Sequence, residues 1–194
     1  MPSRRVRELR LNSCDWPEGR TLSELVEALP ARGLRVLSVT DMQVGGVVPA
    51  ALFEKCAEAE YVGLHDMALT GSIPASFGKC VKLETLWLYG NQLAGSIPDE
   101  LGECAAMEEL GLSGNELTGS VPASLGKCAK LRNLSLFDNQ LEGVVPASEL
   151  AKLTALETLY LVQNEGLTIT ASGKQEIERA APKASFYWPR VVGA

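Results

Sequence analysis

A block of 24 residues recurs along this chain and constrains its fold more than any other feature. "MALTGSIPASFGKC" (67–80), "NQLAGSIPDELGEC" (91–104) and "NELTGSVPASLGKC" (115–128) follow one another at steps of 24 residues. A segment with the spacing L-x-x-L-x-L precedes this block, as in "LETLWLYGNQL" from Leu83. Seven such units begin at Val6, Leu34, Ala59, Leu83, Met107, Leu131 and Leu156. A fixed period of this length is typical of a solenoid, in which each unit packs only on its neighbours.

The two halves of a unit predict different backbone paths. Apolar residues at its first, fourth and sixth positions are expected to point inward from one strand of a parallel sheet. A G-x-[IV]-P motif then provides a turn at glycine and ends regular pairing at proline, in five units: Pro49, Pro74, Pro98, Pro122 and Pro146. The expected fold class is an α/β solenoid, a right-handed superhelix with one curved parallel sheet on its concave face and an extended or 3₁₀-helical convex side.

The combined pattern L-x-x-L-x-L-x-x-N-x-L-x-G-x-[IV]-P-x-x-L-G covers residues 34–167. It resembles the plant-type leucine-rich repeats of receptor-kinase ectodomains and polygalacturonase-inhibiting proteins, and similar repeats occur in protozoan proteins. This resemblance implies the leucine-rich repeat fold. It leaves the ligand open, because the family binds many different ligands on the same framework.

The whole chain, residues 1–194, is expected to form a single leucine-rich repeat domain. Residues 1–33 form an N-terminal unit, whose helix at 21–29 is predicted by a capping-box pair, Thr21 and Glu24. The repeats occupy 34–167. Residues 168–194 are expected to form a helical C-terminal cap that hides the open end of the core, with Ser172 and Gln175 as the capping pair.

Cysteine and asparagine each form a column. Cys56, Cys80, Cys104 and Cys128 recur every 24 residues and are interpreted as reduced, buried thiols, because a linear array does not readily close a tetrahedral metal site. Cys14 is also expected to be structural. The asparagines at the ninth position are expected to satisfy backbone groups at the turn: Asn91, Asn115, Asn139 and Asn164.

Aromatic side chains occupy positions five and seven, which point out of the sheet onto the concave face. Trp87 stands between Gly63 and Gly111 of the neighbouring units, so open space is expected on both sides of its ring. Exposed aromatic clusters favour a binding surface. The alternative is that the rings only stabilise the sheet by stacking across strands. Tyr61, at position three of its unit, lies beside this group. The predicted partner-binding residues are Tyr61, His65, Trp87, Tyr89, Phe137 and Tyr160.

An acidic column borders this surface. Glu60, Glu84 and Glu108 follow the first residue of three consecutive units, and like charges on adjacent strands repel unless solvent or a cation relieves them. We predict that Glu84 and Glu108 belong to the binding site and orient a basic protein or peptide. A solvated edge without function is the alternative.

Composition and motifs exclude several functions. The formal charge of −6 argues against nucleic acid, and no apolar run approaches the length of a membrane span. His65 is the single histidine, and no catalytic, cofactor or metal motif is present, so no enzyme activity, cofactor or metal is predicted. The sequon Asn133-Leu134-Ser135 would place a glycan on the proposed site and is interpreted as unused.

The leading hypothesis is a non-enzymatic module that binds a protein or peptide, as a cytoplasmic scaffold or adaptor. The N-terminus lacks the apolar segment of a secretion signal. The first alternative, suggested by the resemblance, is an extracellular ligand-binding ectodomain fragment of a receptor-like protein, although the paired-cysteine caps and multiple sequons of such ectodomains are missing. A subunit of an enzyme complex is the second alternative. The oligomeric state stays open.

Overall fold

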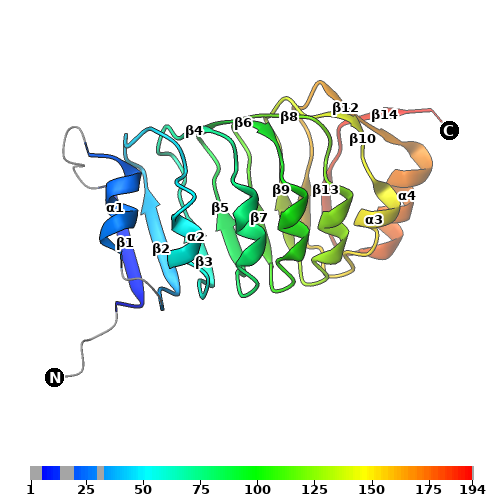
Figure 1. Cartoon of the computed structure of the whole chain (residues 1–194). Coiled ribbons are helices and arrows are strands. Elements are labelled where there is room, and N and C mark those ends of the chain that lie inside the picture. The colour runs from blue at the N-terminus through cyan, green and yellow to red at the C-terminus, as the bar shows by residue number, and fades with distance from the viewer. Residues whose placement is uncertain (1–5, 14–19, 30–32, 194) are drawn as a thin grey trace.

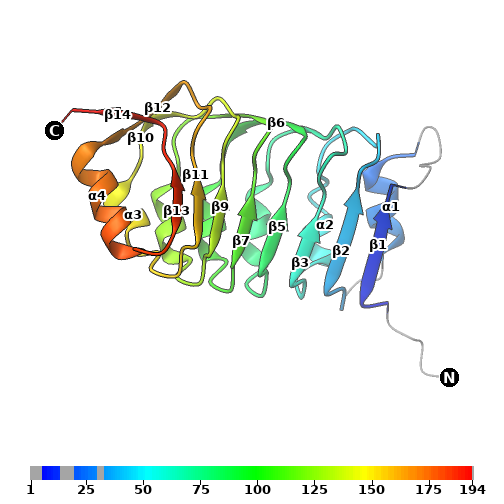
Figure 2. The same ribbon diagram turned by 180° about the vertical axis from the view of Figure 1, so that it is seen from behind.

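Eight parallel strands form one sheet along the length of a right-handed solenoid (Figures 1 and 2). The structure is a computed structural model that describes residues 6–13, 20–29 and 33–193. The strands lie in the sheet in their order along the chain: β1 (Glu8–Asn12), β2 (Val36–Thr40), β3 (Tyr61–Gly63), β5 (Thr85–Trp87), β7 (Glu109–Gly111), β9 (Asn133–Ser135), β11 (Thr158–Tyr160) and β13 (Ser185–Tyr187). The predicted seven-strand sheet is thus confirmed and gains an eighth strand, β13, from the C-terminal segment.

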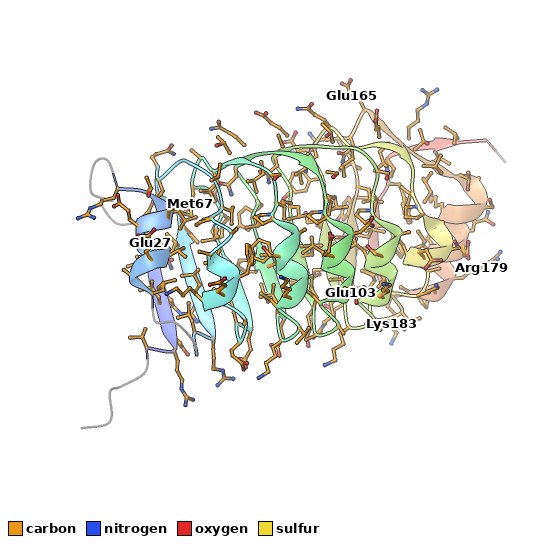
Figure 3. All side chains as sticks on the ribbon, in the orientation of Figure 1. Glu27, Met67, Glu103, Glu165, Arg179 and Lys183 are labelled. Carbon is orange, nitrogen blue, oxygen red and sulfur yellow. The ribbon has the colours of Figure 1, made fainter. Side chains whose placement is uncertain are left out.

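The register of the sheet explains why the leucine pattern specifies it. Residues at the fourth position of each unit are direct neighbours across the strands, so that Val62, Leu86 and Leu110 stack in one row. Their side chains are at most 1% exposed and belong to a core that runs from Leu22 to Ala181. Figure 3 shows side chains filling the interior between the sheet and the convex side. Each removal of a leucine from this row would therefore open a cavity.

The convex side consists of short helices, one per unit. The consensus repeats have 3₁₀ helices that begin directly after proline, and the less regular units have single α-helical turns. These elements are η1 (Ala75–Lys79), η2 (Asp99–Glu103), η3 (Ala123–Lys127), α2 (Leu52–Lys55) and α3 (Ala147–Leu150). The predicted extended or 3₁₀ return path is confirmed.

Between the sheet and the convex helices, the chain forms two further rows of short parallel strands. One row contains β4 (Thr70–Gly71), β6 (Gln92–Ser96) and β8 (Glu116–Thr118), and the other contains β10 (Glu142–Val144), β12 (Gly166–Thr170) and β14 (Arg190–Val192). The motif glycines lie in these rows or at their edges with positive φ, as at Gly95 (φ 80°) and Gly119 (φ 74°). A side chain at these positions would strain the backbone, which accounts for the repeated glycine.

The first and the last helix of the described residues lie at the two ends of the repeats (Figure 1). At the first, α1 (Leu22–Ala28) begins at Thr21, whose hydroxyl accepts a hydrogen bond from the amide of Glu24, as predicted. At the other, α4 (Ala171–Ala180) begins two residues earlier than expected, because Thr170 caps it by accepting from the amide of Gly173 at 3.0 Å. The prediction of Ser172 as the cap was wrong, since Ser172 lies inside the first turn.

The asparagine column forms the predicted ladder of buried hydrogen bonds. The side-chain oxygen of Asn115 accepts from the amide of Leu93 at 3.0 Å, and its NH₂ group donates to the carbonyls of Leu88 and Leu112. The Leu112 carbonyl also accepts from Asn139 of the next unit. Each such carbonyl therefore joins two successive asparagines, and the ladder ties neighbouring turns together.

The cysteine column is also as predicted. Cys56, Cys80, Cys104 and Cys128 are fully buried and carry free thiols. Burial raises the pKa of the Cys104 thiol to about 12, so this thiol stays protonated at neutral pH. Its Sγ lies 3.3 Å from the carbonyl oxygen of Phe77 in the preceding unit. Cys14 lies outside the described residues.

A membrane-spanning helix would need greater length and apolarity than any helix in the described part of the chain has.

Candidate functional site

Four ring side chains from two neighbouring units form the first cluster on the outward side of the sheet. Tyr61 contacts Trp87 edge to face with ring centroids 5.4 Å apart, and His65 stacks on Tyr89 at 4.2 Å. Trp87 joins the two pairs, since its ring centroid lies 6.0 Å from that of His65 and 6.1 Å from that of Tyr89. All four side chains are half-buried. We call Tyr61, His65, Trp87 and Tyr89 the first aromatic cluster.

Glycine residues in the sheet make room for these rings. A Cβ atom at Gly63 would lie 2.8 Å from the hydroxyl oxygen of Tyr61, and one at Gly111 would lie 3.2 Å from Cδ1 of Trp87. The predicted open space beside Trp87 is present on one side only. Tyr61 folds over Gly63 and contacts the Trp87 ring, whereas Gly111 leaves a hollow beyond that ring. Burial raises the pKa of the Tyr61 and Tyr89 phenols further above neutral pH.

A second aromatic cluster lies nearer the C-terminal cap and consists of Phe137, Tyr160 and Tyr187. The rings of Tyr160 and Tyr187 stack at 4.2 Å, and the ring of Phe137 lies 6.0 Å from that of Tyr160. A hydrogen bond between the two phenols raises the pKa of Tyr160. Tyr187 was missed from the sequence because the last strand, β13, carries no leucine-repeat pattern that would place it in the sheet.

A hollow of about 370 Å³ separates the two clusters. Trp87 and Tyr89 line it on the first side and Phe137 on the second. Its remaining lining comes from β7 and β9 and the turn after β7. These residues are small or polar except for Leu110, and they are Glu109, Leu110, Gly111, Ser113, Asn133 and Ser135. The absence of a large side chain at Gly111, between two ring-bearing units, creates this hollow (Figure 2 shows β5, β7 and β9 side by side). The hollow can accept a single side chain of a partner.

The acidic column is partly neutralised within the chain. Arg35 holds Glu60 through hydrogen bonds to both carboxylate oxygens, the shorter at 2.6 Å. At the other end Arg132 pairs with Glu157 and lies 4.0 Å from Glu108. Glu84, between them, is exposed and has no ion pair with any residue that the structure describes. Arg35 and Arg132 therefore relieve the charge repulsion at the two ends of the column. Glu84 in the middle is left to contact solvent or a partner.

The comparisons with known proteins address the fold and the kind of function. A family profile described as Leucine Rich Repeat matches residues 82–104 and 106–128. The complex of BIR3 and SERK2 from Arabidopsis thaliana contains a chain that is 37% identical, with a TM-score of 0.60, over 69% of this chain and 70% of that one. The chain belongs to the leucine-rich repeat family.

Longer members of the leucine-rich repeat family match over more of this chain. A plant peptide hormone receptor, RGFR1 in complex with RGF2, is 29% identical with a TM-score of 0.75, over 85% of this chain and 26% of that one. The Leptospira interrogans protein LIC12759 is 27% identical with a TM-score of 0.66, over 79% and 37%. The search of curated proteins gave no match. This chain therefore spans about a quarter of the length of the plant receptor chain. Membership of the leucine-rich repeat family shows that the chain has the fold of a protein-interaction module.

One group on this leucine-rich repeat surface was not anticipated. The side chains of Asp41, His65 and Asp66 bring ligand-type atoms within 4.8 Å of one another. Nδ1 of His65 lies 2.9 Å from Asp66 Oδ2, and the Thr40 hydroxyl donates to Asp41 at 3.0 Å. Both aspartates occupy the eighth position of their units with positive φ, at 57° and 56°. The equal position in neighbouring repeats is the sequence signal that could have found this pair.

Proposed function

We propose that this chain is a non-enzymatic module that binds a protein or peptide across its concave face. The observation that carries the proposal is the hollow between the two aromatic clusters. Inward leucines already supply the core, so the fold does not require seven outward rings next to an open depression. Such rings provide contact area at a low cost in conformational entropy. The predicted site residues Tyr61, His65, Trp87, Tyr89, Phe137 and Tyr160 all contribute to these clusters, and Glu84 and Glu108 border them.

The two relatives with known partners support a protein or peptide ligand. One was determined with the peptide RGF2, and the other is a complex of two proteins. Plant receptors of this kind favour the extracellular, receptor-like alternative over the cytoplasmic adaptor that the sequence first suggested. We therefore propose that the chain acts as a ligand-binding ectodomain fragment of a receptor-like protein, and that residues 1–194 form one domain around their continuous core.

The free cysteines are consistent with either compartment. A buried and protonated thiol reacts slowly with oxidants, because the thiolate is the reactive species. The raised pKa of about 12 for Cys56 places it in this class. A bridge between these thiols is therefore not required for an extracellular location.

Selection from a displayed random library of twelve-residue peptides tests the binding proposal. We expect peptides whose affinity falls about thirtyfold or more with Trp87→Ala or Phe137→Ala, since a central aromatic anchor contributes about 2 kcal/mol or more. The matched control is Val144→Ala, which removes an exposed apolar side chain of β10 away from the concave face. Its affinity should stay within about twofold of wild type. Peptides that bind Trp87→Ala and Phe137→Ala as tightly as wild type would refute the proposal.

A further inference from the structure

We propose that the hollow between Trp87 and Phe137 receives an arginine side chain of the bound peptide, with its guanidinium group on Glu109. This inference deepens the proposed function and rests on it. It concerns the chemistry of one subsite, and its test separates the two claims. The argument depends on the ring walls of the hollow, on its unsatisfied acceptors, and on the charge around it.

The walls fit a long side chain with a flat end. Trp87 and Tyr89 both approach Gly111, where a Cβ atom would lie 3.2 Å and 3.4 Å from their respective Cδ1 atoms. Phe137 faces them from the other side of the hollow. Aromatic walls accommodate an aliphatic stem by apolar contact and a guanidinium plane by stacking. The volume of about 370 Å³ leaves room for such a side chain.

The floor of the hollow is rich in hydrogen-bond acceptors. Glu109, Ser113, Asn133 and Ser135 contribute a carboxylate, two hydroxyls and an amide. None of these four side chains has a hydrogen bond or ion pair to another residue in the described part of the chain. Among the described residues, every fully buried side-chain nitrogen or oxygen has a partner, so the unpaired polar atoms of these four side chains are accessible to solvent, and all four residues line the hollow. A guanidinium group offers five donors and no acceptor, which complements this set.

The Glu109 carboxylate gives the hollow a negative charge that a cationic side chain would neutralise. Glu109 is half-buried beside the rings, and no described lysine or arginine forms a salt bridge with it. Arg132 acts on Glu109 only at longer range, because it is held by Glu157 and Glu108. The first aromatic cluster already uses this chemistry, since Arg10 lies 5.9 Å above the ring of Tyr61. The hollow offers aromatic rings together with the Glu109 carboxylate, and no described arginine lines it.

Arginine fits this set better than the other basic or neutral side chains. A lysine ammonium is a compact point charge that neither stacks flat on an indole nor pairs with a carboxylate through two parallel bonds. A leucine or phenylalanine would fill the apolar part but would cover Glu109 without a partner, which costs free energy. The subsite should therefore rank arginine above lysine, and lysine above neutral residues.

The test uses the same peptide selection and then compares two side chains of similar shape that differ in charge, arginine and citrulline. We measure by calorimetry the affinity of one selected peptide and of its arginine-to-citrulline analogue for wild type, Glu109→Gln and the control Glu116→Gln, an exposed residue of β8. Citrulline keeps the shape of arginine and removes the charge. We expect a loss of at least about tenfold on wild type and Glu116→Gln, and a much smaller loss on Glu109→Gln.

Each outcome decides one of the two claims. Selected peptides that share an arginine, with a coupling between this residue and Glu109, support the inference. Peptides that depend on Trp87 but lack arginine, or that lose equal affinity on citrulline substitution with and without Glu109, overturn the arginine subsite and leave the binding surface intact. Peptides indifferent to Trp87 and Phe137 overturn both claims, as does a selection that yields no binder.

Discussion

Replacement of Asn115 by leucine tests whether the asparagine ladder holds the repeats together. In the structure the Asn115 side chain makes four hydrogen bonds, one accepted from the Leu93 amide and three donated to the carbonyls of Leu88, Leu112 and Ser113. Leucine has a similar size but can form none of them. The substitution therefore removes the polar contacts with little change in volume.

The loss of stability in Asn115→Leu depends on which backbone groups are left without a hydrogen-bond partner. The Leu88 carbonyl keeps the hydrogen bond from Asn91, the Leu112 carbonyl keeps the one from Asn139, and the Ser113 carbonyl keeps the one from the Gly90 amide. The Leu93 amide loses the acceptor that Asn115 provides. One unpaired buried amide costs about 1–3 kcal/mol, and the three weakened carbonyls add to this, so we expect a loss of about 2–4 kcal/mol.

The assay is urea denaturation followed by circular dichroism. Gln140→Leu is the matched control, because Gln140 is an exposed amide and its loss should change the free energy of unfolding by less than about 0.5 kcal/mol. If Asn115→Leu were as stable as Gln140→Leu, the ladder would contribute nothing to the fold, and the explanation of the asparagine column would be wrong.

Three smaller predictions concern charge and capping. Burial raises the pKa of Cys104 from 9.0 to about 12, so its contribution to stability is complete below pH 9 and is lost between pH 9 and 12. The free energy of unfolding of the wild type should therefore fall between pH 8 and 10, and Cys104→Ala should reduce this fall by at most about 1.4 kcal/mol. An unchanged pH profile would contradict the burial argument. Thr170→Ala should cost about 1 kcal/mol in thermal unfolding and Ser172→Ala clearly less, whereas the reverse order would restore Ser172 as the cap of α4. Glu84→Lys should slow association with a basic peptide and weaken its salt dependence in stopped-flow measurements while leaving stability within about 0.5 kcal/mol; an unchanged association rate would remove Glu84 from the site.

The sequence was sufficient for the repeated part of the fold. Inward leucines at fixed positions determine the sheet, and the recurring glycine and proline determine the return path. Each unit has the same residue pattern and makes the same contacts with its neighbours, so one unit predicts the next. The cap was harder to predict. Strand β13 pairs with β11 through backbone hydrogen bonds that require no leucine pattern, and both Thr170 and Ser172 are acceptable helix caps by residue type.

The sequence was sufficient to predict which aromatic residues of the repeats lie on the concave face, but not the hollow that their side chains form. The strand register places Trp87 beside Gly63 and Gly111, but only the side-chain rotamers decide that Tyr61 covers the first glycine while the hollow opens beyond the second. The place of Glu109 in the lining of the hollow depends on the same packing. The pairing of Arg35 with Glu60 is different, since equivalent positions in adjacent units are always neighbours and this ion pair follows from the repeat alone.

The central claim is that a partner binds on the concave face, between the two aromatic clusters. A titration of the isotope-labelled chain with a selected peptide, followed by amide chemical shifts, tests it most directly. The account predicts that the largest shift changes fall on β5, β7, β9 and β11, around Trp87 and Phe137. Changes confined to the convex helices η1, η2 and η3, with these strands unaffected, would contradict it.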